Sequence, residues 1–311
     1  MTDIFSELKD TFRQRNNGLM KLIVINVVVF LVLAITNVIL WLANSNKIII
    51  EAMEWISLSS NPMKFITRPW TLVTYGFTHD LRSIFHILFN MLNLYFMGRL
   101  VQEFVGSRRV LSIYLLGVVL GGLFFLAFYN FVPRLAFLRG VPLVGASGGV
   151  YALIVAAATL APNMIVSIFG IFPVRLKYIA WFFVLLSFLE LASPNTGGNA
   201  AHLGGALLGY LFILQLRKGR DLGKPINNFL EWWASLFQPK PKMKVTYIKE
   251  KAKVTKTATQ AKQGKPEQTI ASGTVPSQEE LDKILDKISE KGYDSLTKEE
   301  KQKLFNASRE D

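Results

Sequence analysis

Residues 142–153 read PLVGASGGVYAL and place Ser147 among glycines in an uncharged stretch that runs to residue 161. A hydroxyl group in apolar surroundings needs a hydrogen-bond partner, because leaving it unpaired costs free energy. One interpretation is structural: Gly145 and Gly149 are four residues apart, and small residues at this spacing let two helices approach closely. The other is chemical, with Ser147 as a nucleophile. The remainder of the sequence has to decide between them.

This stretch is one of six long apolar runs, which cover residues 20–43, 83–104, 109–132, 145–161, 175–192 and 199–216. Four of the six approach or exceed the roughly 20 residues that a helix needs to cross the hydrocarbon core of a bilayer. The fourth and fifth are shorter, so we expect neighbouring helices to shield them partly. The composition, 51% hydrophobic and 18% charged, is not that of a soluble domain. The sequence predicts an all-α membrane protein with a bundle of six transmembrane helices, and residues 164–174 form an apolar loop or short interfacial segment.

The net charge of +13 is concentrated in clusters beside these runs. The clusters are Lys9, Arg13, Arg15 and Lys21; Arg99, Arg108 and Arg109; Arg175 and Lys177; and Arg217, Lys218 and Arg220. With six spans they all fall on one side of the membrane, and the positive-inside rule makes that side, with both termini, cytoplasmic. The first run is too long for the core of a signal peptide, and the absence of cysteine excludes disulfides.

Composition also divides the chain into segments. We predict a cytoplasmic N-terminal segment (1–18), a six-helix core (19–217), an interfacial amphipathic segment with Trp232 and Trp233 (218–237), a basic disordered linker (238–276) and a small cytoplasmic helical hairpin (277–311). The linker is either a solvated spacer or a segment attracted to anionic lipid. Two capping boxes, Ser277 with Glu280 and Thr297 with Glu300, mark the helices of the hairpin.

Ionisable residues in membrane spans are functional candidates because placing them there is costly. The chain has three histidines, His79, His86 and His202, all in or beside predicted spans. His202 begins a glycine-faced helix in NAAHLGGALLGY (199–210), where Gly205 and Gly209 are four residues apart. Two glycine-faced helices can bring Ser147 and His202 within hydrogen-bond reach, and a hydroxyl beside a neutral imidazole is the minimal pair of nucleophile and base.

A second polar pair lies in HILFN (86–90), where His86 and Asn90 share one helix face. Both side chains can donate the hydrogen bonds that an oxyanion needs when a carbonyl becomes tetrahedral. Taken alone, such a pair more often serves as hydrogen-bonding groups between helices. Beside a serine and a histidine elsewhere, the catalytic interpretation is favoured.

Together these stretches resemble the rhomboid intramembrane serine proteases. GASG matches the family's G-x-S-G motif, AHLGG its A-H-x-x-G motif and HILFN its H-x-x-x-N motif, in the family's order and on the second, fourth and sixth runs. The resemblance covers roughly residues 17–216, and the C-terminal hairpin resembles an appendage of some bacterial members. It implies a rhomboid-like bundle in which Ser147 is the nucleophile and His202 the general base. His86, Asn90 and the backbone N–H of Ser147 would form the oxyanion hole.

The resemblance also suggests supporting residues. Tyr151 either stacks on the catalytic imidazole or packs in the core, and His79 is structural or organises water. Gly145, Gly148 and Gly205 would leave little room beside the nucleophile. The paired glycines in ASPNTGGN (192–199) would permit a movable lid. One departure from the family is the first loop, in which Arg68 precedes Trp70 instead of following a tryptophan.

The sequence therefore predicts a serine-type endopeptidase that cleaves transmembrane segments of single-span membrane proteins near their outer end. A Ser-His dyad needs no metal or cofactor, and we expect the lipid bilayer but no nucleic acid as a partner. The location would be a bacterial inner membrane; the oligomeric state stays open. Alternatives are an inactive rhomboid-like protein that binds membrane clients, and a transporter or channel, for which we detect no internal repeat.

Overall fold

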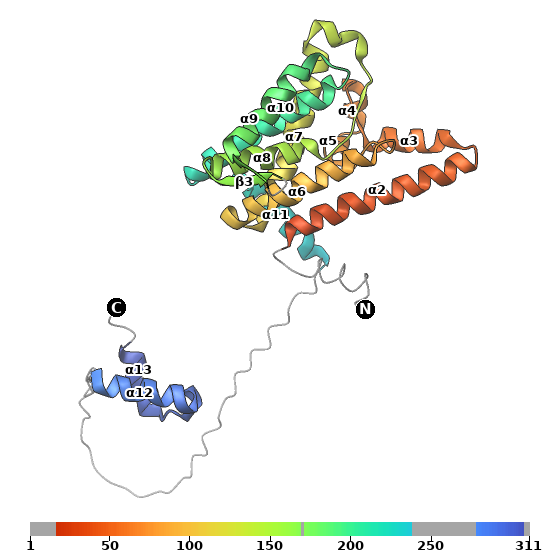
Figure 1. Cartoon of the computed structure of the whole chain (residues 1–311). Coiled ribbons are helices and arrows are strands. Elements are labelled where there is room, and N and C mark those ends of the chain that lie inside the picture. Colours follow the sequence, from red (N-terminus) through yellow and green to blue (C-terminus); the bar gives the residue numbers. More distant parts are fainter. Residues whose placement is uncertain (1–16, 169–170, 238–277, 308–311) are drawn as a thin grey trace, which may run out of the picture. The chain divides into compact units, whose positions relative to one another are not determined.

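The apolar runs of the sequence form helices in the computed structural model, which describes residues 17–168, 171–237 and 278–307. Within these residues, four helices are long and apolar enough to cross a membrane: α2 (Gly18–Leu42), α6 (Ile84–Val105), α7 (Ser107–Phe131) and α10 (Thr196–Arg217) (Figure 1). Two shorter helices, α8 (Ser147–Leu160) and α9 (Leu176–Leu189), have 14 residues each. All six begin and end within a few residues of the predicted runs.

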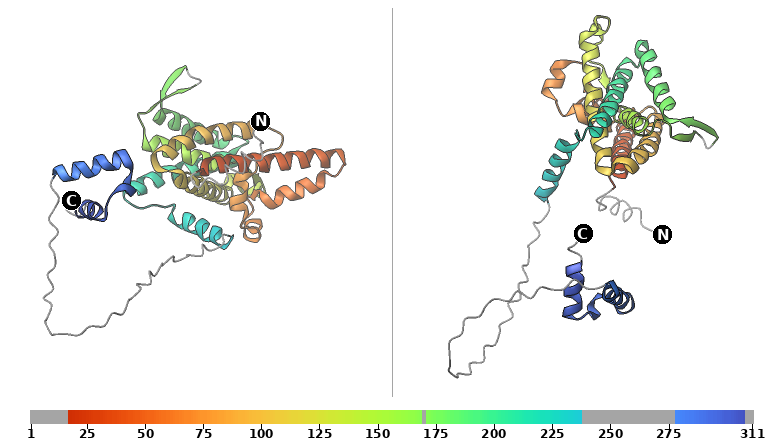
Figure 2. Two further views of the ribbon diagram at one scale, coloured as in Figure 1. Left: turned by 90° about the horizontal axis from the view of Figure 1, so that it is seen from below. Right: turned by 90° about the vertical axis from the view of Figure 1, so that its left-hand side faces the viewer.

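The chain divides into two compact units, residues 1–241 and 242–311. In the first unit, α8 is the central helix: it packs against α6, α7, α9 and α10, and most of its residues are buried (Figure 2). The neighbouring helices shield α8, as predicted, so a short helix is tolerated at this position. By contrast, α9 is covered on one face only. Leu176, Ala180 and Ser187 are buried, whereas Trp181 and Phe182 are exposed.

Small residues permit the closest helix contact of the first unit. A Cβ atom at Gly205 in α10 would overlap the carbonyl oxygen of Gly148 in α8, and one at Gly209 would overlap the carbonyl oxygen of Ala152. The four-residue spacing of these glycines therefore brings the backbones of α8 and α10 into contact. This contact positions Gly148, in the first turn of α8, against Gly205 of α10, which lies three residues after His202.

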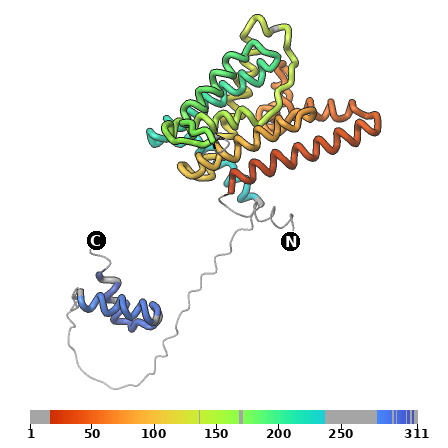
Figure 3. The backbone as a smooth tube through the Cα atoms, viewed as in Figure 1, coloured from red at the N-terminus to blue at the C-terminus, as the bar shows by residue number. Residues whose placement is uncertain are grey.

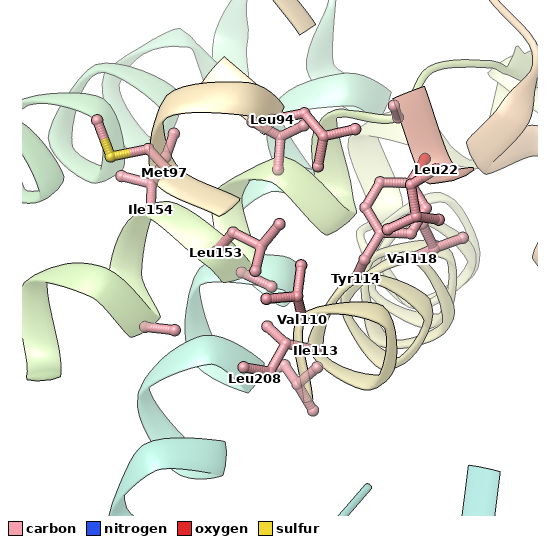
Figure 4. Close-up of a cluster of buried hydrophobic side chains, with 14 of the residues drawn as sticks. Leu22, Leu94, Met97, Val110, Ile113, Tyr114, Val118, Leu153, Ile154 and Leu208 are labelled. Carbon is pink, nitrogen blue, oxygen red and sulfur yellow. The ribbon is translucent and has the colours of Figure 1, made fainter. Parts of the chain in front are cut away.

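Around α8 lies the hydrophobic core, which joins α2, α6, α7 and α10. Figure 4 shows part of this cluster, with Leu22, Leu94, Tyr114, Leu153 and Leu208 among its buried side chains. These residues come from all five helices, so packing in the core fixes the helices relative to one another.

Between α2 and α6 the chain forms several short elements: α3 (Asn46–Ile56), β1 (Leu58–Ser59), α4 (Pro62–Thr67), α5 (Thr71–Thr74) and the 3-10 helix η1 (Tyr75–Phe77). The guanidinium of Arg68 lies 4.1 Å from the ring centre of Trp55. Trp55 in turn stacks on Trp70, with ring centres 5.9 Å apart. The reversed order of Arg68 and Trp70 is thus accommodated, because both side chains pack on Trp55, which precedes them in the sequence.

Tyr75 ties this loop to the helices. Its hydroxyl donates to the carbonyl oxygen of Val118 in α7 at 2.6 Å, and its own carbonyl oxygen accepts from the N–H of Gly145 at 3.0 Å. After α7 the chain passes through the 3-10 helix η2 (Pro133–Leu138) to β2 (Pro142–Leu143), which pairs antiparallel with β1. Tyr75 and this strand pair hold both sides of the segment that leads into α8.

The prediction for residues 164–174 is wrong in its local structure. The segment forms an antiparallel hairpin of β3 (Ile165–Ile168) and β4 (Phe172–Arg175). Isoleucine, valine and phenylalanine favour strands, but the run lacks the alternation that distinguishes a strand from an apolar loop in sequence. With this hairpin and the β1–β2 pair, the protein is mostly helical, and the all-α prediction is corrected accordingly.

Following α10, α11 (Lys224–Phe237) is amphipathic. Arg109 of α7 pairs with Asp221 at 2.8 Å, and Arg108 pairs with Glu231 at 2.7 Å. Asp221 precedes α11 and Glu231 lies within it, so the two pairs hold the start and the polar face of α11 against α7. Trp232 and Trp233 stay exposed. The predicted placement of this segment at the membrane interface stays a prediction.

The second unit contains α12 (Gln278–Lys291), the 3-10 helix η4 (Tyr293–Ser295) and α13 (Lys298–Ala307). The capping box is present: Glu300 accepts from the N–H of Thr297 at 2.7 Å, and the hydroxyl of Thr297 accepts from the N–H of Glu300 at 3.3 Å. Hydrogen bonds from Lys287 and from the Thr297 N–H lower the pKa of Glu300 to about 2. The other predicted box, at Ser277, lies outside the described residues, as do the linker 238–276 and most of the N-terminal segment.

Candidate active site

One pocket brings the three motifs together. It has a volume of about 370 Å³, and its walls include Ser147, Tyr151, His86, Asn90 and His202. These residues come from α8, α6 and α10, which lie side by side in the first unit (Figure 3). Residues separated by more than a hundred positions in sequence therefore meet in one place.

Ser147 is the first residue of α8. The preceding Gly145 has a φ of 129°, a conformation that favours glycine, and this turn directs the chain from β2 into the helix. The first N–H groups of a helix have no partner within it and carry its partial positive charge. Ser147 thus lies where backbone donors are free to bind a developing negative charge.

His202 is held from two sides in α10. Its imidazole stacks on the Tyr151 ring, with centres 4.1 Å apart and planes 8° from parallel. Its Nδ1 lies 3.1 Å from the hydroxyl oxygen of Ser187 in α9. Nε2 is therefore the ring nitrogen available to Ser147. Ser147 and His202 line the same pocket without a direct hydrogen bond, and such bonds are often long until substrate is present.

His86 has its donor proton on the nitrogen that faces the nucleophile. Its Nδ1 accepts from the backbone N–H of Asp80 at 3.3 Å, so Nε2 carries the proton in the neutral ring. A Cβ atom at Gly145 would lie 3.0 Å from this Nε2 and 3.6 Å from the hydroxyl oxygen of Ser147. Hydrogen bonds from Arg82 hold the pKa of the Asp80 carboxyl group below its ordinary value and tie this carboxylate to the turn before α6.

Asn90 completes the donors on α6. One N–H of its side-chain amide donates to the carbonyl oxygen of His86 at 2.8 Å, which fixes the orientation of the amide. The second N–H is left for the pocket, which Asn90 lines. His86, Asn90 and the start of α8 therefore present hydrogen-bond donors to the same space.

The structure separates the remaining predicted residues from the pocket. His79 is fully buried behind it, with its ring 5.3 Å from that of His86 and 6.5 Å from that of Phe30. Among the described residues, neither ring nitrogen of His79 has a partner. Gly148 and Gly205 lie in the α8–α10 contact, and of the three predicted glycines Gly145 alone borders the space between His86 and the Ser147 hydroxyl.

The lid prediction is wrong for its glycines. Gly197 and Gly198 lie in the first turn of α10, which starts at Thr196, and the loop after the 3-10 helix η3 (Glu190–Ala192) is short. The pattern of small and polar residues resembles a loop, but a helix N-terminus has the same composition. Asn195 and Gly198 still line the pocket.

Sequence reasoning missed Ser187. The side chain is 1% exposed, and its hydroxyl contacts both Tyr151 and His202. A lone hydroxyl near the end of an apolar run was the available signal, but nothing in the sequence shows which helix it faces.

Comparison with known proteins finds two family matches and several relatives. Residues 67–219 match the rhomboid domain, and residues 274–310 match a family of unknown function, DUF6576. The chain is 31% identical over 160 residues to RHOMBOID-like protein 12, mitochondrial, of Arabidopsis thaliana, covering 48% of this chain and 47% of that protein. It is 30% identical over 159 residues to Presenilin-associated rhomboid-like protein A, mitochondrial, of Danio rerio, covering 50% and 39%.

The fold and the pocket thus describe a multi-pass membrane protein with a serine in the first turn of α8 and a histidine in the second turn of α10, two helices that touch. The chain carries a rhomboid domain over residues 67–219, and this domain contains Ser147, His202, His86 and Asn90. It spans about half the length, or less, of the curated relatives that it matches.

Proposed function

We propose that this protein is an intramembrane serine endopeptidase with Ser147 as nucleophile and His202 as general base. The observation that carries the proposal is the pocket: a serine at a helix N-terminus faces an imidazole whose Nδ1 is already bonded and whose ring is stacked. An imidazole fixed in this way presents Nε2 as the proton acceptor, which is what a serine nucleophile requires.

In the proposed reaction, Nε2 of His202 takes the Ser147 proton as the serine oxygen attacks the scissile carbonyl. The carbonyl oxygen becomes negative and accepts hydrogen bonds from Nε2–H of His86, from the free N–H of Asn90 and from the N–H of Ser147. His202 then protonates the leaving amine, and an acyl-enzyme on Ser147 results. A water molecule, deprotonated by His202, releases the second product and restores Ser147.

The proposed topology has six spans, α2, α6, α7, α8, α9 and α10, with both termini cytoplasmic. The basic clusters support it because they lie together on one side of such an arrangement. Ser147 follows a connection on the opposite side, so the pocket opens toward the outer face. The resemblance of the C-terminal hairpin to an appendage of bacterial members supports a bacterial plasma membrane.

We expect a single-span substrate to be cut near its outer end, after a small residue such as alanine. A transmembrane helix hides its carbonyl groups in internal hydrogen bonds, so a cleavable segment must unwind easily. Gly145 lies between His86 and Ser147, and Phe85, Phe89 and Phe183 narrow the pocket. Mass spectrometry of the products tests this prediction; a cut at the cytoplasmic end, or after a bulky aromatic residue, contradicts it.

Asn90→Ala is expected to lower kcat while changing KM little, because the hydrogen bond to the oxyanion forms mainly in the transition state. Loss of one such donor costs about 10²–10³ in rate, and the donors that remain soften the loss. Asn93→Ala is the matched control within the same pocket: its amide makes the same type of bond, to the Phe89 carbonyl, and lies three residues farther along α6 from His86 than Asn90 does, so we expect a much smaller effect. If only KM changed in Asn90→Ala, Asn90 would be a structural residue.

A further inference from the structure

Ser187 lies at the point where three helices meet around the imidazole. It is on α9, its hydroxyl oxygen is 3.0 Å from the hydroxyl of Tyr151 on α8, and it is 3.1 Å from Nδ1 of His202 on α10. With 1% of its surface exposed, the side chain has no access to water that could replace either partner. A buried hydroxyl is stable only with its hydrogen bonds made, so this geometry constrains all three side chains.

The tautomer of His202 depends on the direction of these hydrogen bonds, because Nδ1 either donates to Ser187 or accepts from it. In one arrangement Ser187 donates its single proton to the Tyr151 oxygen. In that arrangement the lone pairs of Ser187 accept from Nδ1–H of His202. A neutral imidazole with its proton on Nδ1 has an unprotonated Nε2. This is the form in which His202 can remove a proton from Ser147.

We propose that Ser187 is a positioning residue that holds His202 in the tautomer and ring orientation required of the base. The inference rests on the proposed dyad and adds a third member to it: a hydroxyl occupies the place that a carboxylate takes in Ser-His-Asp enzymes. A hydroxyl serves this role in a membrane without burying a charge, which would be costly. Tyr151 supports the arrangement twice, by stacking on the imidazole and by accepting from Ser187.

The test compares Ser187→Ala with Ser187→Thr in the full-length protein, using a model single-span substrate. Ser187→Ala should lower kcat about tenfold, the rate equivalent of one neutral hydrogen bond, with KM unchanged. Ser187→Thr keeps the hydroxyl and should therefore retain most of the wild-type kcat. Ser167→Ala removes a hydroxyl from the exposed hairpin and serves as the control. Unchanged kcat in Ser187→Ala, or equal losses in both Ser187 variants, would overturn the proposal.

A second readout does not depend on cleavage. Nitrogen NMR of protein with isotope-labelled histidine reports which ring nitrogen carries the proton. The signals of His202 are assigned by their loss in His202→Ala. Wild type should show a protonated Nδ1, and Ser187→Ala should show a mixture of tautomers. If wild type neither cleaves nor reacts with a serine probe, the proposed function fails while this spectrum still decides the role of Ser187. An identical spectrum in wild type and Ser187→Ala refutes that role.

Discussion

Ser147→Ala and His202→Ala are each expected to abolish cleavage of a single-span substrate, while both variants still insert and fold. Without Ser147 no acyl-enzyme forms, and without His202 nothing removes the serine proton. Loss of one member of such a catalytic unit lowers kcat on the order of 10⁴- to 10⁶-fold, and loss of both adds little because the residues act together. The measurement is product formation in liposomes, with the double variant included.

Two controls make this result specific. Ser167→Ala tests loss of a hydroxyl outside the pocket, and the thermal unfolding temperature of each variant tests the fold. Substantial activity in either Ser147→Ala or His202→Ala would contradict the proposed catalytic dyad. An inactive wild type that still binds single-span proteins would instead favour a client-binding rhomboid relative.

Gly205→Val is expected to prevent stable packing of α10 on α8. The new side chain would meet the backbone carbonyl of Gly148, which cannot move without disturbing the first turn of α8. Overpacking a core costs about 1–3 kcal/mol even when flexible side chains can shift, and here the obstacle is backbone. We expect a large fall in the unfolding temperature and loss of monodisperse protein, with Gly205→Ala intermediate.

Leu207→Ala is the matched control for this helix. Leu207 is 41% exposed, and its side chain lies on the outer face of α10. Leu207→Ala removes as many carbon atoms as Gly205→Val adds. Its unfolding temperature should stay close to that of wild type. A Gly205→Val variant that folds and remains as active as wild type would show that α8 and α10 need not touch.

The sequence predicts those parts of the structure that local patterns determine. The six apolar runs locate the helices because burial in lipid needs length and hydrophobicity alone. Gly205 and Gly209 indicate the contact with α8 because their four-residue spacing places two residues without side chains on the same face of the helix. The three motifs indicate the pocket because the two histidines that lie within these runs, His86 and His202, both fall in them.

What the sequence leaves open depends on contacts between distant segments. Arg68 and Trp70 gain their role from Trp55, and only the folded loop brings the three together. Gly148 and Gly205 serve in helix packing. Because both lie in the catalytic motifs, the sequence suggests a role beside the nucleophile instead. Ser187 acts through Tyr151 and His202. The packing of α9 against the bundle determines that the Ser187 side chain points toward these two residues.

Reaction with a fluorophosphonate probe tests the dyad most directly, because it requires an activated serine but no knowledge of the natural substrate. The purified protein is treated with the probe in detergent and digested, and the adduct is located by mass spectrometry. We expect one adduct on the peptide that contains Ser147, no labelling in Ser147→Ala and labelling that is strongly slowed in His202→Ala. Absence of labelling in the folded wild type, or an adduct that persists in Ser147→Ala, would contradict the assignment of Ser147 as the nucleophile.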